Sequence, residues 1–372
     1  MEDNKLFTEF PPISTEKWEE VINKDLKGAD YDKKLVWKTI EGFNVKPYYR
    51  AEDLEGLEYL NGNPSEEPFV RGKKADNNVW DIRQDIRESD PVKANGFALE
   101  AIKRGVNSLG LCACKIEGMA EMEALLKGIN PEEVKINFIC AKDYVATLKL
   151  FVEYLQKKGY DTKKVAGSCS CDMFRHALKH GKYQQSEEGD LQTAKTLVEY
   201  AKANLPQFRA LAIHGTTFHN AGSNIVQELG FSLAAANELI ARLTDMGCKM
   251  EQVASSITMN FGTGSNYFME IAKIRAARLL WSKMVAEYKP QCDCAYKLFI
   301  HATSSTWNKS GYDPYVNMLR STTETMSAAV AGADSISVLP FDAAYKESDE
   351  FGHSIAHNQQ LLLKEESYMD KI

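Results

Sequence analysis

From residue 79 onward, short apolar runs alternate with longer segments whose apolar residues recur at helical spacing. We expect eight strands, each followed by a helix, since no two runs are joined by a hairpin turn. The predicted strands cover residues 79–84, 107–114, 135–141, 165–170, 209–215, 254–260, 296–302 and 334–339. The predicted helices cover residues 90–104, 118–127, 143–158, 190–204, 224–246, 266–288, 314–331 and 352–366. Such even alternation favours an α/β fold of the (β/α)8 TIM-barrel type over an open doubly wound sheet, which stays possible.

The first 78 residues lack this alternation. We predict an N-terminal helical arm, a hairpin and a linker in residues 1–78, ahead of a barrel in residues 79–372. Ser14 is placed to cap a helix that contains Trp18, and two extended runs around Gly42 indicate the hairpin. An amphipathic arm ahead of a self-contained barrel needs a surface to lie on, so we expect it to dock on another chain.

One βα unit, in residues 254–281, gives the clearest local pattern. Its strand ends in a loop bounded by Gly262 and Gly264, and Ser265 is placed to cap the long helix that follows. Because sites of α/β enzymes lie at the carboxyl ends of strands, we expect the two glycines to edge a pocket. Within the helix, Arg275 interrupts an apolar stripe, so we expect its guanidinium to be buried and paired with a carboxylate.

Charge and composition exclude several classes of function. The net charge of the 372 residues is −7, with both signs interspersed, which provides no basic stripe for a nucleic-acid partner. No apolar run approaches the roughly 18 residues of a membrane span, and the first residues lack a signal-peptide pattern. We therefore expect no nucleic-acid or membrane partner and place the chain in the cytoplasm.

The eight cysteines form no familiar pattern. Five of them, Cys112, Cys114, Cys140, Cys169 and Cys171, fall inside predicted strands, where side chains two residues apart are poorly placed to bridge, so we expect reduced thiols. The three C-x-C pairs, which include that of residues 292 and 294, lack the second pair or the histidines of a zinc site. We predict no metal site.

Candidate chemistry lies at the carboxyl ends of the predicted strands, which meet at one mouth of a barrel. The polar residues there are Arg83, Asp85, Ser170, Asp172, His214, Thr216, Thr217, His219, Asn260, His301 and Thr303, with His180 in the loop after the fourth strand. Histidines near one mouth could ligate a metal or act as acid and base, but none has metalloprotease spacing. Nucleophile-elbow, Walker and dinucleotide-binding motifs do not occur.

Several ordered motifs carry a family resemblance. Residues 264–281, Gly-Ser-Asn-Tyr-Phe-Met-Glu-Ile-Ala-Lys-Ile-Arg-Ala-Ala-Arg-Leu-Leu-Trp, resemble the sixth βα unit of adenosylcobalamin-dependent methylmalonyl-CoA mutases. Further motifs follow in the family's order at residues 39–48, 68–72, 81–84, 313–315 and 358–367, so the resemblance spans roughly residues 14–367. It implies a (β/α)8 barrel with the CoA pantetheine threaded along its axis and adenosylcobalamin at its mouth.

The chain departs from the catalytic members of that family on strands one and four. Where they carry a tyrosine that helps to expel the adenosyl group, this chain has Asp85. A glutamine and an asparagine of strand four are replaced by Ser170 and Cys171. His301 and Trp307 do match the family.

Further departures affect the groups that would hold the acyl substrate. Thr216 and Thr217 stand at the places of a tyrosine and of the histidine that hydrogen-bonds the thioester carbonyl. The arginine that grips the substrate carboxylate aligns with His180, and an arginine of strand seven aligns with Phe299. The resemblance therefore implies that the catalytic positions are degenerate.

This pattern resembles the small, non-catalytic subunits of heterodimeric bacterial members of the family. It implies a homologous catalytic large subunit as partner and adenosylcobalamin in the holoenzyme. We expect no cofactor on this chain alone, which ends before the family's cobalamin domain and has no Asp-x-His-x-x-Gly motif. Acyl-CoA is a further candidate ligand, at a mouth formed by Arg83, His214, His219, Asn260, His301 and Thr303. Two alternatives stay open: a catalytic mutase of altered specificity that uses protonated His180 or His219, and a stand-alone acyl-CoA-binding barrel.

Overall fold

The computed structural model describes residues 9–371. The chain divides into two compact units, Met1–Asn61 and Gly62–Ile372.

The larger unit is built on a ring of parallel strands. In order around the sheet these are β7 (Gln207–Arg209), β6 (Ala166–Cys169), β5 (Lys135–Cys140), β4 (Ser108–Cys112), β3 (Asp81–Ile86), β11 (Ser335–Ser337), β10 (Phe299–Ser304), β9 (Ile257–Thr263) and β8 (Leu211–His214). The first and last strands in this order, β7 and β8, are consecutive in the chain and separated only by Ala210. They act as one interrupted strand, because β7 pairs with β6 while β8 pairs with β9. The ring is thereby closed through a single residue, and the predicted (β/α)8 barrel is confirmed.

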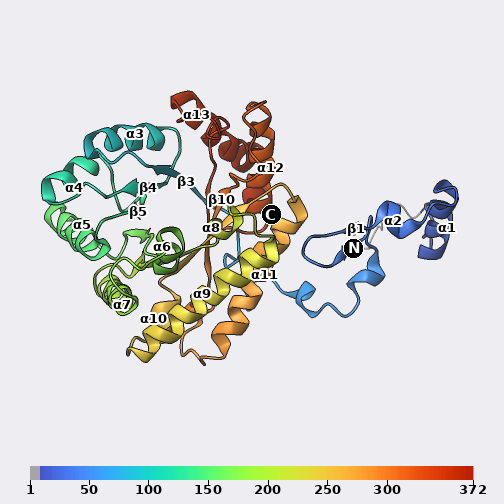
Figure 1. Cartoon of the computed structure of the whole chain (residues 1–372), viewed down its shortest axis with the longest axis horizontal. Helices are drawn as coiled ribbons and strands as arrows, with labels where there is room; N and C mark the ends of the chain where they lie inside the picture. Colours follow the sequence, from blue (N-terminus) through green and yellow to red (C-terminus); the bar gives the residue numbers. More distant parts are fainter. Residues whose placement is uncertain (1–8, 372) are drawn as a thin grey trace, which may run out of the picture. The chain divides into compact units, whose positions relative to one another are not determined.

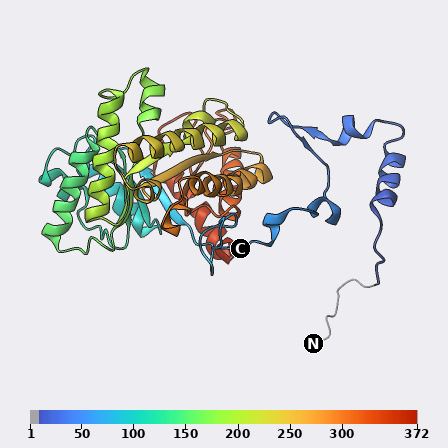
Figure 2. The same ribbon diagram turned by 90° about the horizontal axis from the view of Figure 1, so that it is seen from below.

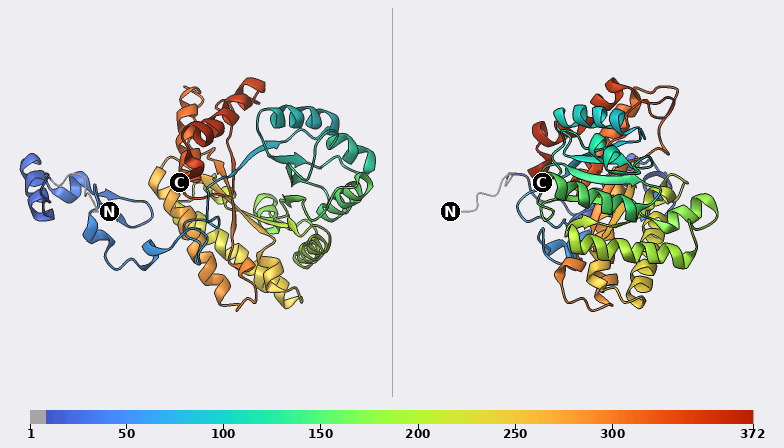
Figure 3. Two further views of the ribbon diagram at one scale, coloured as in Figure 1. Left: turned by 180° about the vertical axis from the view of Figure 1, so that it is seen from behind. Right: turned by 90° about the vertical axis from the view of Figure 1, so that its left-hand side faces the viewer.

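Longer helices surround the outer face of this ring (Figures 1 and 2). They are α3 (Pro91–Lys103), α4 (Met119–Leu125), α5 (Tyr144–Lys158), α7 (Glu187–Asn204), α9 (Ile225–Asp245), α11 (Tyr267–Ala286), α12 (Val316–Val330) and α13 (Glu350–Leu361), with the short α10 (Met250–Ala254) between α9 and β9. The short helices α6 (Met173–His180) and α8 (Gly215–His219) directly follow β6 and β8 and lie nearer the centre in Figure 1. The long helices α9 and α11 pack side by side, as Figure 3 shows from behind. The eight predicted strands and helices are confirmed, whereas the short helices α6, α8 and α10 were not predicted.

The core lies between the strands and the helices. Phe138 of β5 meets Phe151 of α5 edge to face at 5.3 Å, and both rings pack against Phe208 of β7. All three side chains are fully buried, and each contributes about 1.5–3 kcal/mol by leaving water. This aromatic cluster holds the interrupted strand against its neighbours.

Two buried charge networks lie on the opposite side of the barrel. Lys273 of α11 bonds Glu228 and Glu270, each at 2.6 Å. On the same helix, Arg278 bonds Asp334 at 3.2 Å and is 1% exposed.

The prediction that Arg275 is buried and paired with a carboxylate is wrong. Arg275 is half-buried, its one described hydrogen bond goes to the carbonyl of Val330 at 3.5 Å, and burial together with nearby Arg71 lowers its pKa. The predicted apolar stripe of this helix includes Phe268, which is 80% exposed, so the stripe does not mark the buried face. The paired arginine of this helix lies three residues later, at Arg278.

The smaller unit contains the predicted arm and hairpin. Helix α1 (Thr15–Asp25) begins after Ser14, whose hydroxyl accepts a hydrogen bond from the backbone of Lys17. After α2 (Tyr31–Leu35), strands β1 (Trp37–Lys38) and β2 (Asn44–Val45) pair in antiparallel fashion, and the 3-10 helices η1 (Ala51–Leu54) and η2 (Glu58–Asn61) follow. Helix α1 has no buried residue, and Trp18 is 46% exposed. Trp18 meets Tyr48 edge to face at 5.9 Å, so the arm presents a half-exposed aromatic side chain.

Two further features bear on the predicted environment of the chain. Across residues 9–371, no helix combines the length and the apolar character that crossing a membrane requires. The five cysteines predicted to be reduced are free, as is Cys248, whereas Cys292 and Cys294 are joined by a disulfide.

Candidate functional site

Strand register brings several predicted residues together across neighbouring strands, near the middle of β9 and β10 rather than at their carboxyl ends. His214 of β8 and His301 of β10 are both register partners of Asn260 on β9. His301 is in turn the partner of Ser335 on β11. Since partners in a parallel pair point to the same face, these side chains form one polar level of the barrel.

Two residues farther along the strands, where Arg83 of β3 is the register partner of Ser337, two charges on β3 are paired with each other. Nε of Arg83 lies 2.7 Å from Oδ1 of Asp85 on the same strand. Burial alone would raise the pKa of Asp85, but the charge and hydrogen bond of Arg83 outweigh burial and hold the pKa below its usual value. Arg83 is thereby committed to an internal carboxylate.

His301 is a neutral hydrogen-bonding residue. Its Nδ1 lies 3.1 Å from the hydroxyl of Ser335, and its Nε2 lies 3.2 Å from that of Thr303. Burial, reinforced by the charge of Arg83, lowers the pKa of His301 to about 3. The imidazole therefore carries no charge near neutral pH.

His214 is held by Asp172. One carboxylate oxygen of Asp172 accepts the backbone N–H of His214 at 2.8 Å and lies 2.9 Å from its Nδ1. The other oxygen caps helix α6 by accepting the backbone N–H of Arg175 at 2.9 Å. Burial lowers the pKa of His214 despite the carboxylate beside it.

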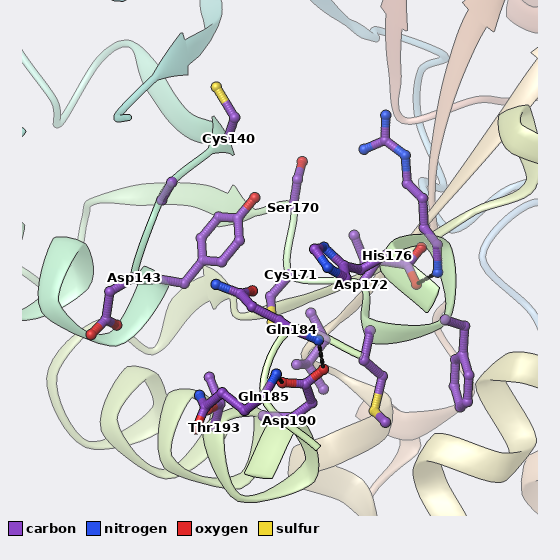
Figure 4. Close-up of a pocket in the computed structure, with 18 of the residues that line it drawn as sticks. Cys140, Asp143, Ser170, Cys171, Asp172, His176, Gln184, Gln185, Asp190 and Thr193 are labelled. Atoms are coloured by element: carbon purple, nitrogen blue, oxygen red, sulfur yellow. Dashed lines mark hydrogen bonds between the residues drawn. The ribbon is translucent and has the colours of Figure 1, made fainter. Parts of the chain in front are cut away.

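A pocket of about 440 Å³ opens beside this level, between β5, β6, α6 and α7 (Figure 4). Among the predicted residues, Ser170, Cys171, Asp172 and His180 line it. Asp190 shapes its floor by accepting the backbone N–H groups of residues 184 and 185 at 2.9 and 3.1 Å. The structure thus separates the predicted site into a pocket group and a barrel-interior group.

His180 is not in a loop, contrary to the prediction. It is the last residue of α6, is exposed, and lies against His176, with the two rings tilted and their centres 4.5 Å apart. Helix α6 was overlooked because it has only eight residues. Its boundary signals are in the sequence, since Asp172 caps its start and Gly181 ends it with a φ of 68°.

Positive charge gathers on α6 along the pocket. Arg175 and Lys179 both line it, and neither was predicted. Nε of Arg175 is buried without a hydrogen-bond partner. The charge of Arg175, then burial and Arg87, lowers the pKa of Lys179. Such a group of cations favours a negatively charged ligand.

His219 lies away from this pocket. It ends the short helix α8, where its Nδ1 lies 3.2 Å from Glu228 and its Nε2 lies 2.8 Å from the hydroxyl of Ser305. Its ring occupies the place where a Cβ on Gly262 would be, which explains the glycine. Gly262 and Gly264 therefore pack against a buried histidine and line neither pocket that the structure describes.

Three more predicted residues, Ser265, Thr216 and Thr217, lie in a short loop or in a short helix. Ser265 does not cap α11, since the cap position is Asn266, and Glu270 instead accepts the backbone N–H of Gly264 at 3.0 Å. Thr216 and Thr217 are half-buried residues of α8.

The chain matches the family model described as methylmalonyl-CoA mutase over residues 38–114 and 106–372. It is 48% identical to the methylmalonyl-CoA mutase small subunit of Porphyromonas gingivalis, over all of this chain and 60% of that protein. It is 29% identical to the small subunit of Streptomyces virginiae, over 99% of this chain and 60% of that protein. It is also 29% identical to the methylmalonyl-CoA mutase of Cereibacter sphaeroides, over 95% of this chain and 54% of that protein. The chain thus spans little more than half the length of these relatives, and it belongs to the methylmalonyl-CoA mutase family.

Proposed function

We propose that this chain is the small subunit of an adenosylcobalamin-dependent methylmalonyl-CoA mutase and that its barrel is a non-catalytic scaffold for a homologous catalytic subunit. The similarity to small subunits supports the first part of the proposal. The observation that carries the second part is that Arg83 and His214 of the barrel-interior group are held by the carboxylates of Asp85 and Asp172.

Rearrangement of an acyl-CoA that bears a carboxylate needs a cation for that carboxylate and a donor for the thioester oxygen. Arg83 is bound to Asp85 at 2.7 Å, and His301 is neutral because its pKa is about 3. Thr216 and Thr217 can offer hydroxyl groups but no charge. The barrel interior therefore supplies no uncommitted cation from these positions.

The same residues do not fit adenosylcobalamin. That cofactor supplies radical chemistry when it is bound, and the protein has to present it at an open mouth. His214, His219 and His301 are each held by hydrogen bonds to Asp172, Glu228 and Ser335, respectively, so none of these three imidazoles is free to face a corrin. Our proposal assigns the cofactor to the catalytic subunit and the complex to the cytoplasm.

The test pairs this chain with a catalytic subunit that has been inactivated at its own thioester-binding histidine. We expect the assembled complex, supplied with adenosylcobalamin and methylmalonyl-CoA, to form neither succinyl-CoA nor cob(II)alamin. The complex with the active partner should turn over, and Thr216→Val or Thr217→Val in this chain should leave kcat within about twofold. A catalytic donor would instead cost about 10²–10³ in kcat. Turnover by the inactivated complex would overturn the scaffold proposal.

A second candidate function rests on α6. The buried, unpartnered Nε of Arg175 and the adjacent Lys179 would suit an acyl-CoA carboxylate, as a mutase of altered specificity requires. His219 is not available for that role, since Glu228 and Ser305 hold it. Calorimetric titration with methylmalonyl-CoA separates the two functions. If the barrel is only a scaffold, the unmodified chain and Arg175→Gln should not differ in their binding of methylmalonyl-CoA. A loss of binding in Arg175→Gln, with unchanged binding in Lys283→Gln as the surface control, would favour the altered-specificity mutase.

A further inference from the structure

An irregularity in the pairing of β4 with β5 brings three cysteines together. The register runs Leu111 with Phe138 and then Cys112 with Cys140, so that Ile139 is skipped. Such a bulge changes the direction of the side chains that follow it, and bulges recur beside functional sites. The backbone N–H of Ala113 bonds the carbonyl of Cys140 at 2.8 Å and fixes the two strand ends beyond the bulge.

The third cysteine comes from the turn after β4. Cys114 lies two residues beyond Cys112, and the sulfur atoms of Cys112, Cys114 and Cys140 all lie within 4.8 Å of one another. Three thiolates around a tetrahedral zinc ion, each at about 2.3 Å, have sulfurs about 3.8 Å apart. For the three cysteines to bind one ion, each sulfur–sulfur distance therefore has to shorten by about 1 Å or less.

We propose that Cys112, Cys114 and Cys140 bind one Zn²⁺ ion through their three sulfur atoms, with a fourth coordination position for water or a small ligand. Three protein ligands and one open position are the arrangement of zinc sites that exchange a ligand. Cys140 also lines the pocket of about 440 Å³, so a molecule in that pocket can approach the ion. This proposal replaces the sequence-based prediction of no metal site. It does not depend on the proposed subunit role.

Sequence spacing could not reveal this cluster. Zinc motifs place two ligands a few residues apart and the next pair at a set distance, whereas here the third cysteine is supplied by the neighbouring strand. Within residues 9–371, it is the one group of three His, Cys, Asp or Glu residues whose ligand atoms converge in this way.

A charged side chain beside the cluster suits a bound zinc ion. Three thiolates with one Zn²⁺ carry a net charge of −1, and the positive charge of Lys142 acts on Cys114. Lys142 is itself held at 2.8 Å by Glu117.

The experiment uses the full chain carrying Cys292→Ser and Cys294→Ser, because that bonded pair would become a competing dithiol under reducing conditions. The reduced protein is titrated with Co²⁺ without oxygen. We expect sulfur-to-cobalt charge-transfer absorption and intense visible bands of a tetrahedral site that saturate at one ion per chain. Added Zn²⁺ should bleach these bands, and competition with a chromophoric chelator then gives the Zn²⁺ affinity.

Cys112→Ser and Cys140→Ser should each weaken Zn²⁺ binding by at least about 100-fold, more than the loss of a supporting residue around a metal site typically causes. Two matched controls should bind like the parent protein. Cys171→Ser changes a cysteine that lines the same pocket outside the cluster, and Cys248→Ser changes a buried cysteine elsewhere. Circular dichroism confirms that each variant is folded.

Three outcomes would overturn the proposal. The first is a Co²⁺ complex without thiolate charge transfer, and the second is a Zn²⁺ affinity that Cys140→Ser leaves unchanged. The third is tight binding of Cu⁺ by a protein that does not bind Zn²⁺, since soft thiolates accept either ion.

Discussion

The buried lysine of α11 offers the sharpest test of how this barrel is stabilised. The side chain of Lys273 is fully buried, and its Nζ lies 2.6 Å from Glu228, 2.6 Å from Glu270 and 2.6 Å from the carbonyl of Gly262. Lys273→Met keeps a similar side-chain length but removes the cation. We expect this variant to lose about 3–5 kcal/mol in the free energy of unfolding, the usual cost of leaving buried charge unpaired.

The geometry supports that magnitude. Since both carboxylates lie 2.6 Å from one nitrogen, their oxygens are at most 5.2 Å apart (2.6 + 2.6). Two like charges at that distance repel by about 3 kcal/mol when the effective dielectric constant is about 20. Glu228 also accepts a hydrogen bond from the backbone N–H of Gly262 at 2.8 Å, and we expect the variant to retain it. This one hydrogen bond offsets only part of the repulsion.

The network also sets a pH window. Burial alone would lower the pKa of Lys273 and raise that of Glu228, but their mutual attraction outweighs it, so the pKa of Lys273 is raised and that of Glu228 is lowered. The contribution from Lys273 is complete below its unfolded pKa of about 10.5 and is lost as the pH rises through the folded value. The contribution from Glu228 is complete above its unfolded pKa of about 4.5 and is lost as the pH falls through the folded value. The effect of Lys273→Met should therefore be largest between these limits.

Urea unfolding at pH 7, followed by circular dichroism and tryptophan fluorescence, measures the loss. Lys283→Met on the exposed side of the same helix is the control and should change stability by less than about 0.5 kcal/mol. The double variant Lys273→Met, Glu228→Gln should recover part of the loss, because it removes one of the two repelling carboxylates. A single variant within 1 kcal/mol of the parent protein, or a double variant less stable than the single one, would refute this reasoning.

Three other outcomes are expected. Asp334→Asn should cost about 3–5 kcal/mol in urea unfolding, because it leaves the buried Arg278 without its carboxylate; a loss below 1 kcal/mol would contradict the pairing. Because burial depresses its pKa to about 3, His301 should show no titration by NMR above about pH 4. The free energy of unfolding should decrease as the pH falls below 6.5, where the imidazole of the unfolded chain takes up a proton. An NMR titration midpoint of His301 near pH 6.5 would instead show an exposed imidazole. If the proposed partner subunit binds the arm, Trp18→Asp should weaken co-elution with that subunit and leave the urea transition of the isolated chain unchanged, whereas equal loss of both would place the arm in this chain's own core.

The sequence predicted the elements of the barrel closely, and helix α5 shows why. Residues 143–158 were predicted, and the structure has Tyr144–Lys158. Asp143 caps its start, and Gly159 ends it with a φ of 77°. These signals are local, so they do not depend on the rest of the fold.

The pairing of charges on α11 could not be predicted in the same way. That helix packs against α9 on one side and α12 on another, so apolar residues occur almost all around it and do not define a single stripe. Arg275 and Arg278 lie three residues apart, and only the position of Asp334 on a distant part of the chain selects the second. The carboxylate partner of an arginine is a property of the assembled barrel.

The sequence by itself therefore determined the order and approximate bounds of the eight main strands and helices, the hairpin and arm, and the family, but not the short helices α6, α8 and α10. Each of these depends on spacing and capping among neighbouring residues. The tertiary structure decided that His214 and His301 are neutral members of a self-satisfied network and that the sulfur of Cys140 lies beside those of Cys112 and Cys114. These features depend on strand register and on burial, which place residues far apart in the chain within a few ångströms of one another.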